Sequence, residues 1–216
     1  AREMEQRIER ALFRDADEAQ RERPIRFRGR RRAEDIELYL VCCPCGAMGS
    51  YRSRANDFWC ASCDRGGHID EYGRLKGFDF ETISELADWQ EPRLTLALSE
   101  WPGSQRTLRQ HGVRLLRAIG RHIHRPVAEG DAILTPDALR VGEHTVPLDR
   151  VHACNMQNDN SIEFSMGRFR YRIEQPSRRT HYHRAPYYLW MRVIQECSRA
   201  LREAPEGLRK GNYTAI

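Results

Sequence analysis

The pattern of apolar and polar residues changes its period along the chain. Residues 2–22 carry apolar side chains every three or four positions among charged ones, and residues 80–98 repeat this spacing. Such spacing places apolar side chains on one face of a helix. Both segments are therefore predicted to be amphipathic helices, the first stopped by Pro24 and the second interrupted by Pro92.

The second half of the chain consists of short apolar runs separated by turn residues, which predicts roughly seven β-strands. Val113, Leu115 and Ile119 begin this region and are expected to face the core. Alternation is clearest over residues 161–173, which read as a hairpin. A single helical stripe follows the strands and is formed by Tyr187, Trp190, Met191, Ile194, Cys197 and Leu201.

Four of the seven cysteines form two matched pairs. Two residues separate Cys42 from Cys45, two separate Cys60 from Cys63, and 14 residues lie between the pairs. Four thiolates at this spacing are typical of a tetrahedral zinc ribbon, which is a structural site. We therefore predict one zinc ion held by Cys42, Cys45, Cys60 and Cys63. Iron at the same positions and thiols without any metal are the alternatives.

Cys43 lies next to the first predicted ligand and competes with it. Only Cys42 gives the two-residue gap to Cys45, so Cys43 is interpreted as a bystander. Cys154 and Cys197 are isolated in the sequence and are expected to be ordinary buried thiols. An odd total of seven cysteines, with four assigned to a metal, favours a reducing compartment over a secreted disulfide scaffold.

These patterns predict an α+β chain with a small four-cysteine zinc ribbon, connecting helices and a larger antiparallel β-domain. Strands closed by one amphipathic helix are typical of a pleckstrin-homology-like (PH-like) barrel, and an unrelated small β-domain is the alternative. The predicted divisions are an N-terminal helical connector at 1–38, the zinc ribbon at 39–77, a linker helix at 78–104, the PH-like domain with its C-terminal helix at 105–204, and a tail at 205–216.

Charge is unevenly distributed over the chain, whose net charge is +5. Residues 39–90 contain five basic and eight acidic side chains, whereas a ribbon that binds a phosphate backbone usually carries positive charge itself. Residues 106–125 contain six arginines and no acidic residue. Arg117, Arg121 and Arg125 are therefore candidates for contact with an anionic surface, with internal ion pairing as the alternative.

Two further features concern the surroundings of the protein. No apolar run approaches the roughly 20 residues that span a bilayer. The arginine-rich segment 24–32 either contacts an anionic surface or is a solvated connector. Because Ala1 lies inside a predicted helix, we expect the chain to be a piece of a longer polypeptide.

The order of these parts resembles the C-terminal region of bacterial 1-acyl-sn-glycerol-3-phosphate (lysophosphatidate) acyltransferase family proteins. The resemblance spans most of residues 5–200. It implies a zinc ribbon, a connecting helix and a β-rich region that serve an acyltransferase domain upstream in the same polypeptide. The stretches that carry it are RRAEDIELYLVCCPCG, FWCASCDRGG, YGRLKGF, ELADWQ, LTPDALRVG and VPLDRV.

The catalytic motif of that family, Asn-His-x4-Asp, has only a coincidental counterpart in this chain. His144 and Asp149 have its spacing, but Glu143 stands in place of the asparagine and Pro147 lies inside the stretch. Residues five apart on an extended strand also point to opposite faces. We therefore predict no catalytic residues, and a free-standing acyltransferase that uses His144 and Asp149 is the alternative.

The function predicted from the sequence is that of an accessory region of a phospholipid-synthesis acyltransferase, with a structural or membrane-targeting task. The expected location is the cytoplasm, peripheral on the inner face of the membrane. A zinc-ribbon module that binds nucleic acid or a protein partner is the competing class. Salt-sensitive DNA binding would favour that class, whereas binding to anionic vesicles would favour the first.

Overall fold

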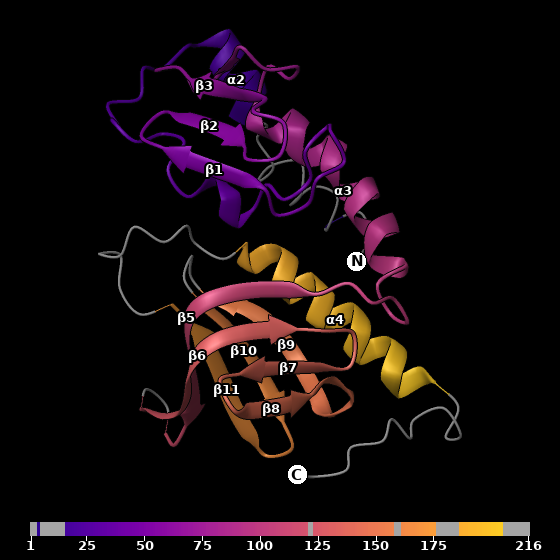
Figure 1. The fold of residues 1–216 in the computed structure, drawn as a ribbon. Coiled ribbons are helices and arrows are strands. Elements are labelled where there is room, and N and C mark those ends of the chain that lie inside the picture. Colours follow the sequence, from indigo (N-terminus) through magenta and orange to yellow (C-terminus); the bar gives the residue numbers. More distant parts are fainter. Residues whose placement is uncertain (1–3, 5–15, 121–122, 158–160, 176–185, 205–216) are drawn as a thin grey trace.

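The computed structural model of the chain contains two antiparallel β-sheets joined by a long helix (Figure 1). It describes residues 4, 16–120, 123–157, 161–175 and 186–204. The strand order is β1-β2-β3-β4 in the smaller sheet and β8-β7-β6-β5-β11-β10-β9 in the larger one. The predicted α+β class is confirmed. None of the described helices combines the length and the apolar character needed to cross a bilayer.

The smaller sheet is the ribbon that carries the paired cysteines. Its strands are packed so closely that only glycine fits at Gly66, because an added Cβ would lie 2.2 Å from the carbonyl oxygen of Phe58. The ring of Phe58 contacts the rings of Tyr51 and Phe78 edge-on and forms the centre of a small core. The strands are β1 (Tyr51–Arg54), β2 (Asp57–Cys60), β3 (Gly66–Ile69) and β4 (Leu75–Lys76).

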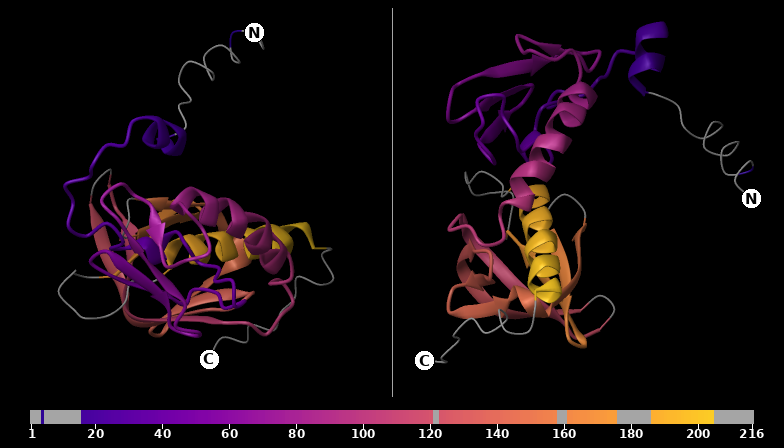
Figure 2. Two further views of the ribbon diagram at one scale, coloured as in Figure 1. Left: turned by 90° about the horizontal axis from the view of Figure 1, so that it is seen from above. Right: turned by 90° about the vertical axis from the view of Figure 1, so that its right-hand side faces the viewer.

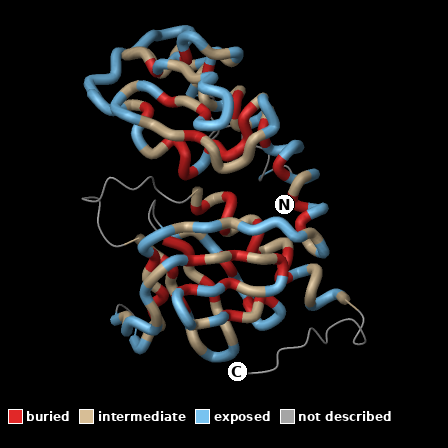
Figure 3. The backbone as a smooth tube through the Cα atoms, in the orientation of Figure 1, coloured by how far each residue is buried: buried red, intermediate tan, exposed pale blue. Residues whose placement is uncertain are grey.

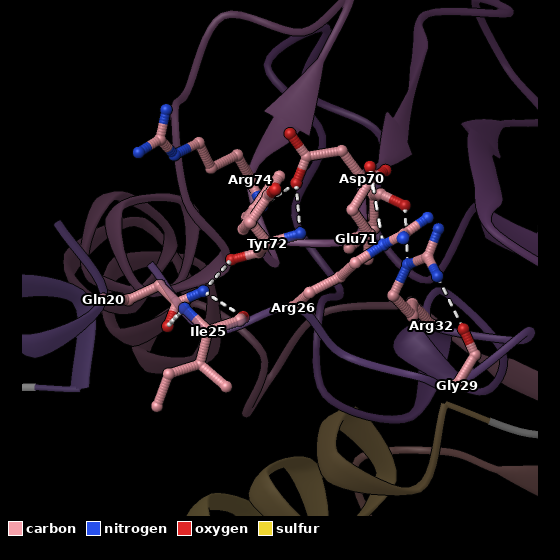
Figure 4. A network of polar contacts seen from close by, with 10 residues as sticks. Gln20, Ile25, Arg26, Gly29, Arg32, Asp70, Glu71, Tyr72 and Arg74 are labelled. Atoms are coloured by element: carbon pink, nitrogen blue, oxygen red, sulfur yellow. Dashed lines mark hydrogen bonds and ion pairs between the residues drawn. The ribbon is translucent and has the colours of Figure 1, made fainter. Parts of the chain in front are cut away.

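The N-terminal segment binds across the ribbon (Figure 4). It includes α2 (Ala16–Glu22), which lies within the helix predicted over 2–22. The Gln20 side-chain amide donates to the carbonyl oxygen of Tyr72 at 3.1 Å, and the backbone N–H of Phe27 donates to that of Glu71 at 2.7 Å. These contacts attach the arginine-rich segment to the ribbon surface.

The connecting helix α3 (Ile83–Ser99) continues through Pro92, so the predicted interruption is wrong. The Thr82 side chain caps its first turn by accepting from the backbone N–H of Glu85 at 3.1 Å. Proline removes one helical hydrogen bond, but packing of an apolar face outweighs that loss. The buried face of α3 consists of Leu86, Gln90, Leu94 and Leu98.

Gln90 holds the segment that leads into the first cysteine pair and is only 4% exposed. Its Oε1 accepts from the backbone N–H groups of Val41 at 2.9 Å and Cys42 at 3.2 Å. Its Nε2 donates to the carbonyl oxygen of Tyr39 at 3.0 Å. The Gln90 side chain thus pairs backbone groups that would otherwise be buried without a partner.

The larger sheet is strongly curved, and its first and last strands in sequence, β5 and β11, are neighbours. The hydrogen-bonded order ends at β8 on one side and β9 on the other, so the predicted barrel is not closed among the described residues. The strands are β5 (Leu108–Ala118), β6 (His124–Leu134), β7 (Ala138–Val141), β8 (His144–Pro147), β9 (Val151–Gln157), β10 (Ser161–Met166) and β11 (Phe169–Glu174).

The C-terminal helix α4 (Tyr187–Glu203) lies between the two wings of this curved sheet (Figure 2, right). Its predicted apolar stripe is present but wider than expected. Leu189 and Val193 are also fully buried, whereas Met191 and Leu201 are half-buried. The stripe is wider because α4 also contacts the ribbon, where Gly49 approaches the Leu189 side chain.

One hydrophobic core passes from the β-domain through α4 into the ribbon. Leu38, Val41 and Cys42 contribute to it from the ribbon side, and Trp101 from the end of α3. Polar contacts reinforce this junction on the surface, because Arg192 on α4 pairs with Glu91 on α3 at 2.7 Å. The two sheets are therefore packed as parts of one body.

Replacing Gln90 by alanine should lower the free energy of unfolding by about 3 kcal/mol, because two buried N–H groups and one carbonyl lose their partner. Urea unfolding followed by circular dichroism measures this difference. The matched control is Gln105→Ala, since Gln105 is exposed. A loss below about 1 kcal/mol for Gln90→Ala would contradict the role assigned to this amide.

Glu37 should make stability depend on pH. Burial raises the pKa of Glu37, although the Ser53 hydroxyl donates to its carboxylate at 2.5 Å. A carboxyl group whose pKa is raised on folding adds stability below its unfolded pKa, and this stability is lost as pH rises through the folded pKa. We expect Glu37→Gln to melt at a higher temperature than the parent at neutral pH, and the difference to vanish in acid.

Thermal unfolding of the parent and of Glu37→Gln over a pH series measures this difference in melting temperature, with a substitution of the exposed Glu34, Glu34→Gln, as control. An unchanged pH dependence in Glu37→Gln would show that the carboxyl group is not the cause.

Candidate metal centre

Four cysteine side chains converge at one end of the ribbon. Their Sγ atoms all lie within 4.8 Å of one another. The Sγ atoms of Cys43 and Cys63 are 3.7 Å apart, and those of Cys45 and Cys60 are 3.8 Å apart. Four thiolates bound at about 2.3 Å to one tetrahedral ion lie about 3.8 Å from one another, whereas a disulfide bond is about 2.05 Å long. The arrangement can therefore hold one metal ion.

The structure brings Cys43 to this cluster in place of the predicted Cys42. Cys42 forms an isolated antiparallel bridge with Met48, and its N–H is bound by Gln90. Neighbouring residues on an extended backbone point to opposite sides. Cys42 accordingly packs in the core shared with α4, and Cys43 packs in the core of the ribbon. The predicted ligand set is corrected to Cys43, Cys45, Cys60 and Cys63.

The backbone positions each sulfur in the same way. The N–H of Ser62 donates to the Sγ of Cys60 at 3.4 Å, and the amide two residues further on also donates to each of the other three sulfurs. Left-handed residues produce this geometry after the second cysteine of each pair, Gly46 with φ 90° and Asp64 with φ 56°. Hydrogen bonds from amides stabilise thiolate charge. The two halves of the site are thus built alike.

The surroundings of the cluster differ between its two sides. Burial raises the pKa of Cys43 to about 12, whereas the Ala47 amide lowers the pKa of the exposed Cys45 to about 7. Tyr51 lies beside Cys43 on the buried side, and burial raises the pKa of its hydroxyl as well. A bound cation would favour the thiolate forms of all four cysteines. The exposed Cys45 and Cys63 mark the side from which an ion can reach the site.

An ion held by the cluster would have no position open to a substrate. Four protein thiolates complete a tetrahedral shell, so no coordination position remains for a substrate. His68 is close in sequence but pairs with Asp57, with Nδ1 2.7 Å from the carboxylate oxygen. The cluster therefore has the arrangement of a structural metal site.

His144 and Asp149 are not brought together. His144 is half-buried on β8 and Asp149 is exposed in the short helix η2 (Leu148–Arg150). No hydrogen bond or ion pair between them is present in the described part of the chain. The Nε2 atom of His144 is buried and has no hydrogen-bond partner among the described residues.

Two of the three arginines proposed as surface contacts, Arg117 and Arg125, lie on β5 and β6. Arg117 lies opposite Arg125 in the strand register, and its guanidinium group is 5.0 Å from the centre of the Phe169 ring. Arg125 is exposed. Arg121 lies outside the described residues.

A cavity of about 320 Å³ lies between β9 and α4. Gln195 donates to the carbonyl oxygen of Cys154 at 2.7 Å, and Arg202 donates to that of Val151. Side chains of α4 therefore cover the edge of the sheet at β9, which protects it from pairing with another strand. The buried hydroxyl of Ser198 also lines this cavity and has no partner within the described ranges.

No protein-family model matches the chain, and no curated protein matches it either. A function is therefore inferred from the metal centre, the two sheets and the distribution of charge.

Replacing Cys43 by serine should abolish metal binding, because the shell loses one of its four thiolates, whereas Cys42→Ser should retain about one ion per chain. Elemental analysis of the purified proteins measures their metal content.

Chelation should also unfold the ribbon, since metal binding and folding are linked in such sites. Full occupancy in Cys43→Ser together with loss in Cys42→Ser would restore the ligand set expected from spacing.

Proposed function

We propose that this chain is a non-catalytic accessory region, stabilised by one zinc ion, of a bacterial enzyme that acylates lysophosphatidate. The closed cluster of four thiolates, in a ribbon that shares its core with the β-domain, supports the non-catalytic and zinc-stabilised part of the proposal. The choice of enzyme rests on the resemblance of the sequence. Such a site contributes folding energy and no reaction step. Zinc is proposed over iron because a structural shell of four thiolates is a common use of zinc in proteins.

The arrangement of the larger sheet supports a PH-like interpretation of the β-domain. Four strands, β5 to β8, follow one another as an antiparallel meander, and β9 to β11 form a second meander that returns to β5. The helix α4 comes after the last strand and packs on β9 and β10. A helix that covers the opening of a curved antiparallel sheet was the pattern expected from the sequence.

Charge argues against the competing class, a ribbon that binds nucleic acid. The ribbon is acidic over residues 39–90. Several arginines of the N-terminal segment have partners within the chain. Arg26 lies 3.9 Å from Glu71, and Arg32 donates to the carbonyl oxygen of Ile69 at 3.0 Å. Nucleic-acid binding depends on basic side chains that are available to phosphates.

The partner in this proposal is an acyltransferase domain encoded upstream in the same polypeptide. Sequencing the gene upstream of the codon for Ala1 tests for this domain. The upstream reading frame should encode a domain with the Asn-His-x4-Asp motif. The longer polypeptide should transfer an acyl group from a thioester to lysophosphatidate. An upstream frame without such a domain would overturn the proposal.

The 216-residue chain alone should show no acyl transfer to lysophosphatidate, because no base is held beside a substrate site in the part of the chain that is described. An assay with an acyl thioester donor and purified chain measures this, with the longer polypeptide as positive control. Turnover that disappears in His144→Ala would instead identify the chain as a free-standing enzyme.

A further inference from the structure

The turn between β5 and β6 exposes two isoleucines at one end of the larger sheet. Ile119 is 59% exposed and Ile123 is 62% exposed, and the N–H of Ile119 donates to the carbonyl oxygen of Ile123 at 2.9 Å. Figure 3 shows this end of the hairpin as exposed backbone that projects from the β-domain. Ile119 was expected in the core with Val113 and Leu115, and this prediction is wrong. Packing within the described chain does not account for the two side chains.

Three arginines lie around these isoleucines without an ion pair in the described part of the chain. Arg117 and Arg125 are opposite each other on β5 and β6. Arg117 and Arg168 each lie 5.0 Å from the centre of the Phe169 ring, which brings their charges to the same aromatic side chain. Cationic side chains grouped on one part of a surface favour an anionic partner.

Acidic side chains near this surface already have partners. No acidic residue occurs between Glu100 and Glu129 in the sequence. Glu163 binds Arg172 and lies 3.8 Å from His124, and Glu174 binds Arg114 at 3.0 Å. The positive charge at the hairpin is therefore not offset by the carboxylates of these neighbouring strands.

We propose that Arg117, Ile119, Ile123, Arg125 and Arg168, called here the hairpin-tip surface, dock on an anionic lipid bilayer. Isoleucine side chains insert at the boundary between headgroups and acyl chains, and the arginines contact lipid phosphates. A bilayer provides partners for both the isoleucines and the arginines of this surface. Nucleic acid would bind the arginines but leave the isoleucines in water. The inference rests on the proposed function in assigning a membrane task, and it names the surface that performs it.

Sedimentation with lipid vesicles tests the docking directly. The chain should bind phosphatidylglycerol-containing vesicles increasingly as the anionic fraction rises, and should bind phosphatidylcholine vesicles weakly. The double variant Ile119→Ser with Ile123→Ser should weaken binding by about tenfold or more, because it removes the inserted apolar groups. Leu96→Ser is the matched control, since Leu96 is 65% exposed on α3 in the other part of the molecule.

The contribution of the arginines is measured separately, by the salt dependence of vesicle binding. Replacing Arg117 and Arg125 by serine should weaken binding to anionic vesicles and should reduce the dependence of that binding on salt. Equal binding by the parent and by both double variants at low salt would overturn the proposal. Binding of the parent to DNA in preference to vesicles would also overturn it, in favour of a nucleic-acid contact.

Insertion can be distinguished from simple adsorption. Tryptophan introduced as Ile123→Trp should be quenched by lipids brominated near the headgroup, whereas Leu96→Trp should not be. Quenching of both or of neither would contradict insertion of the hairpin tip. These outcomes are independent of the upstream gene: an acyltransferase domain without vesicle binding overturns only the docking, and docking without such a domain overturns only the proposed function.

Discussion

The structure depends on how residues 38–43 are divided between two cores. Leu38, Val41 and Cys42 pack toward α4 and the larger sheet, while Leu40 and Cys43 pack toward the ribbon. Gln90 fixes this division. Its side-chain amide binds backbone groups of Tyr39, Val41 and Cys42, and so sets the direction in which the Cys43 side chain points. A segment buried on both sides has no water for its backbone groups and needs such a partner. The metal site and the junction between the sheets therefore have one cause.

Much of the ribbon could be predicted from the sequence, and the one ligand that was missed shows where such prediction ends. Two cysteine pairs identify a metal site because thiolates at short spacing converge on one ion. Spacing describes distance along the chain, whereas the choice between Cys42 and Cys43 depends on side-chain direction. That direction is set by Gln90, 48 residues further on. The repeated amide geometry around the four sulfurs was the physical signal, and it is visible only in three dimensions.

The strands of the β-domain could be predicted from the sequence, but whether its sheet closes into a barrel could not. Alternation identifies a half-buried strand because successive side chains point to opposite faces. It fails at Ile119 because β5 ends at Ala118, so Ile119 lies beyond the last paired position and no longer follows the alternation of the strand. Whether β8 meets β9 is equally invisible to local patterns, because pairing between distant strands depends on the curvature of the whole sheet.

The two parts of the molecule differ in what holds them together, and this difference explains why a bound metal ion would stabilise the ribbon more than the β-domain. The ribbon has four short strands around a few aromatic rings, and a core of that size rarely sustains a fold without a staple. The larger sheet encloses α4 and a wider set of buried side chains. Cys43 lies in the cluster and its neighbour Cys42 packs in the larger core. Fixing the position of Cys43 therefore also fixes the position of Cys42. A metal ion at the ribbon would thus also fix the surface against which α4 packs, which is a structural task suited to an accessory region.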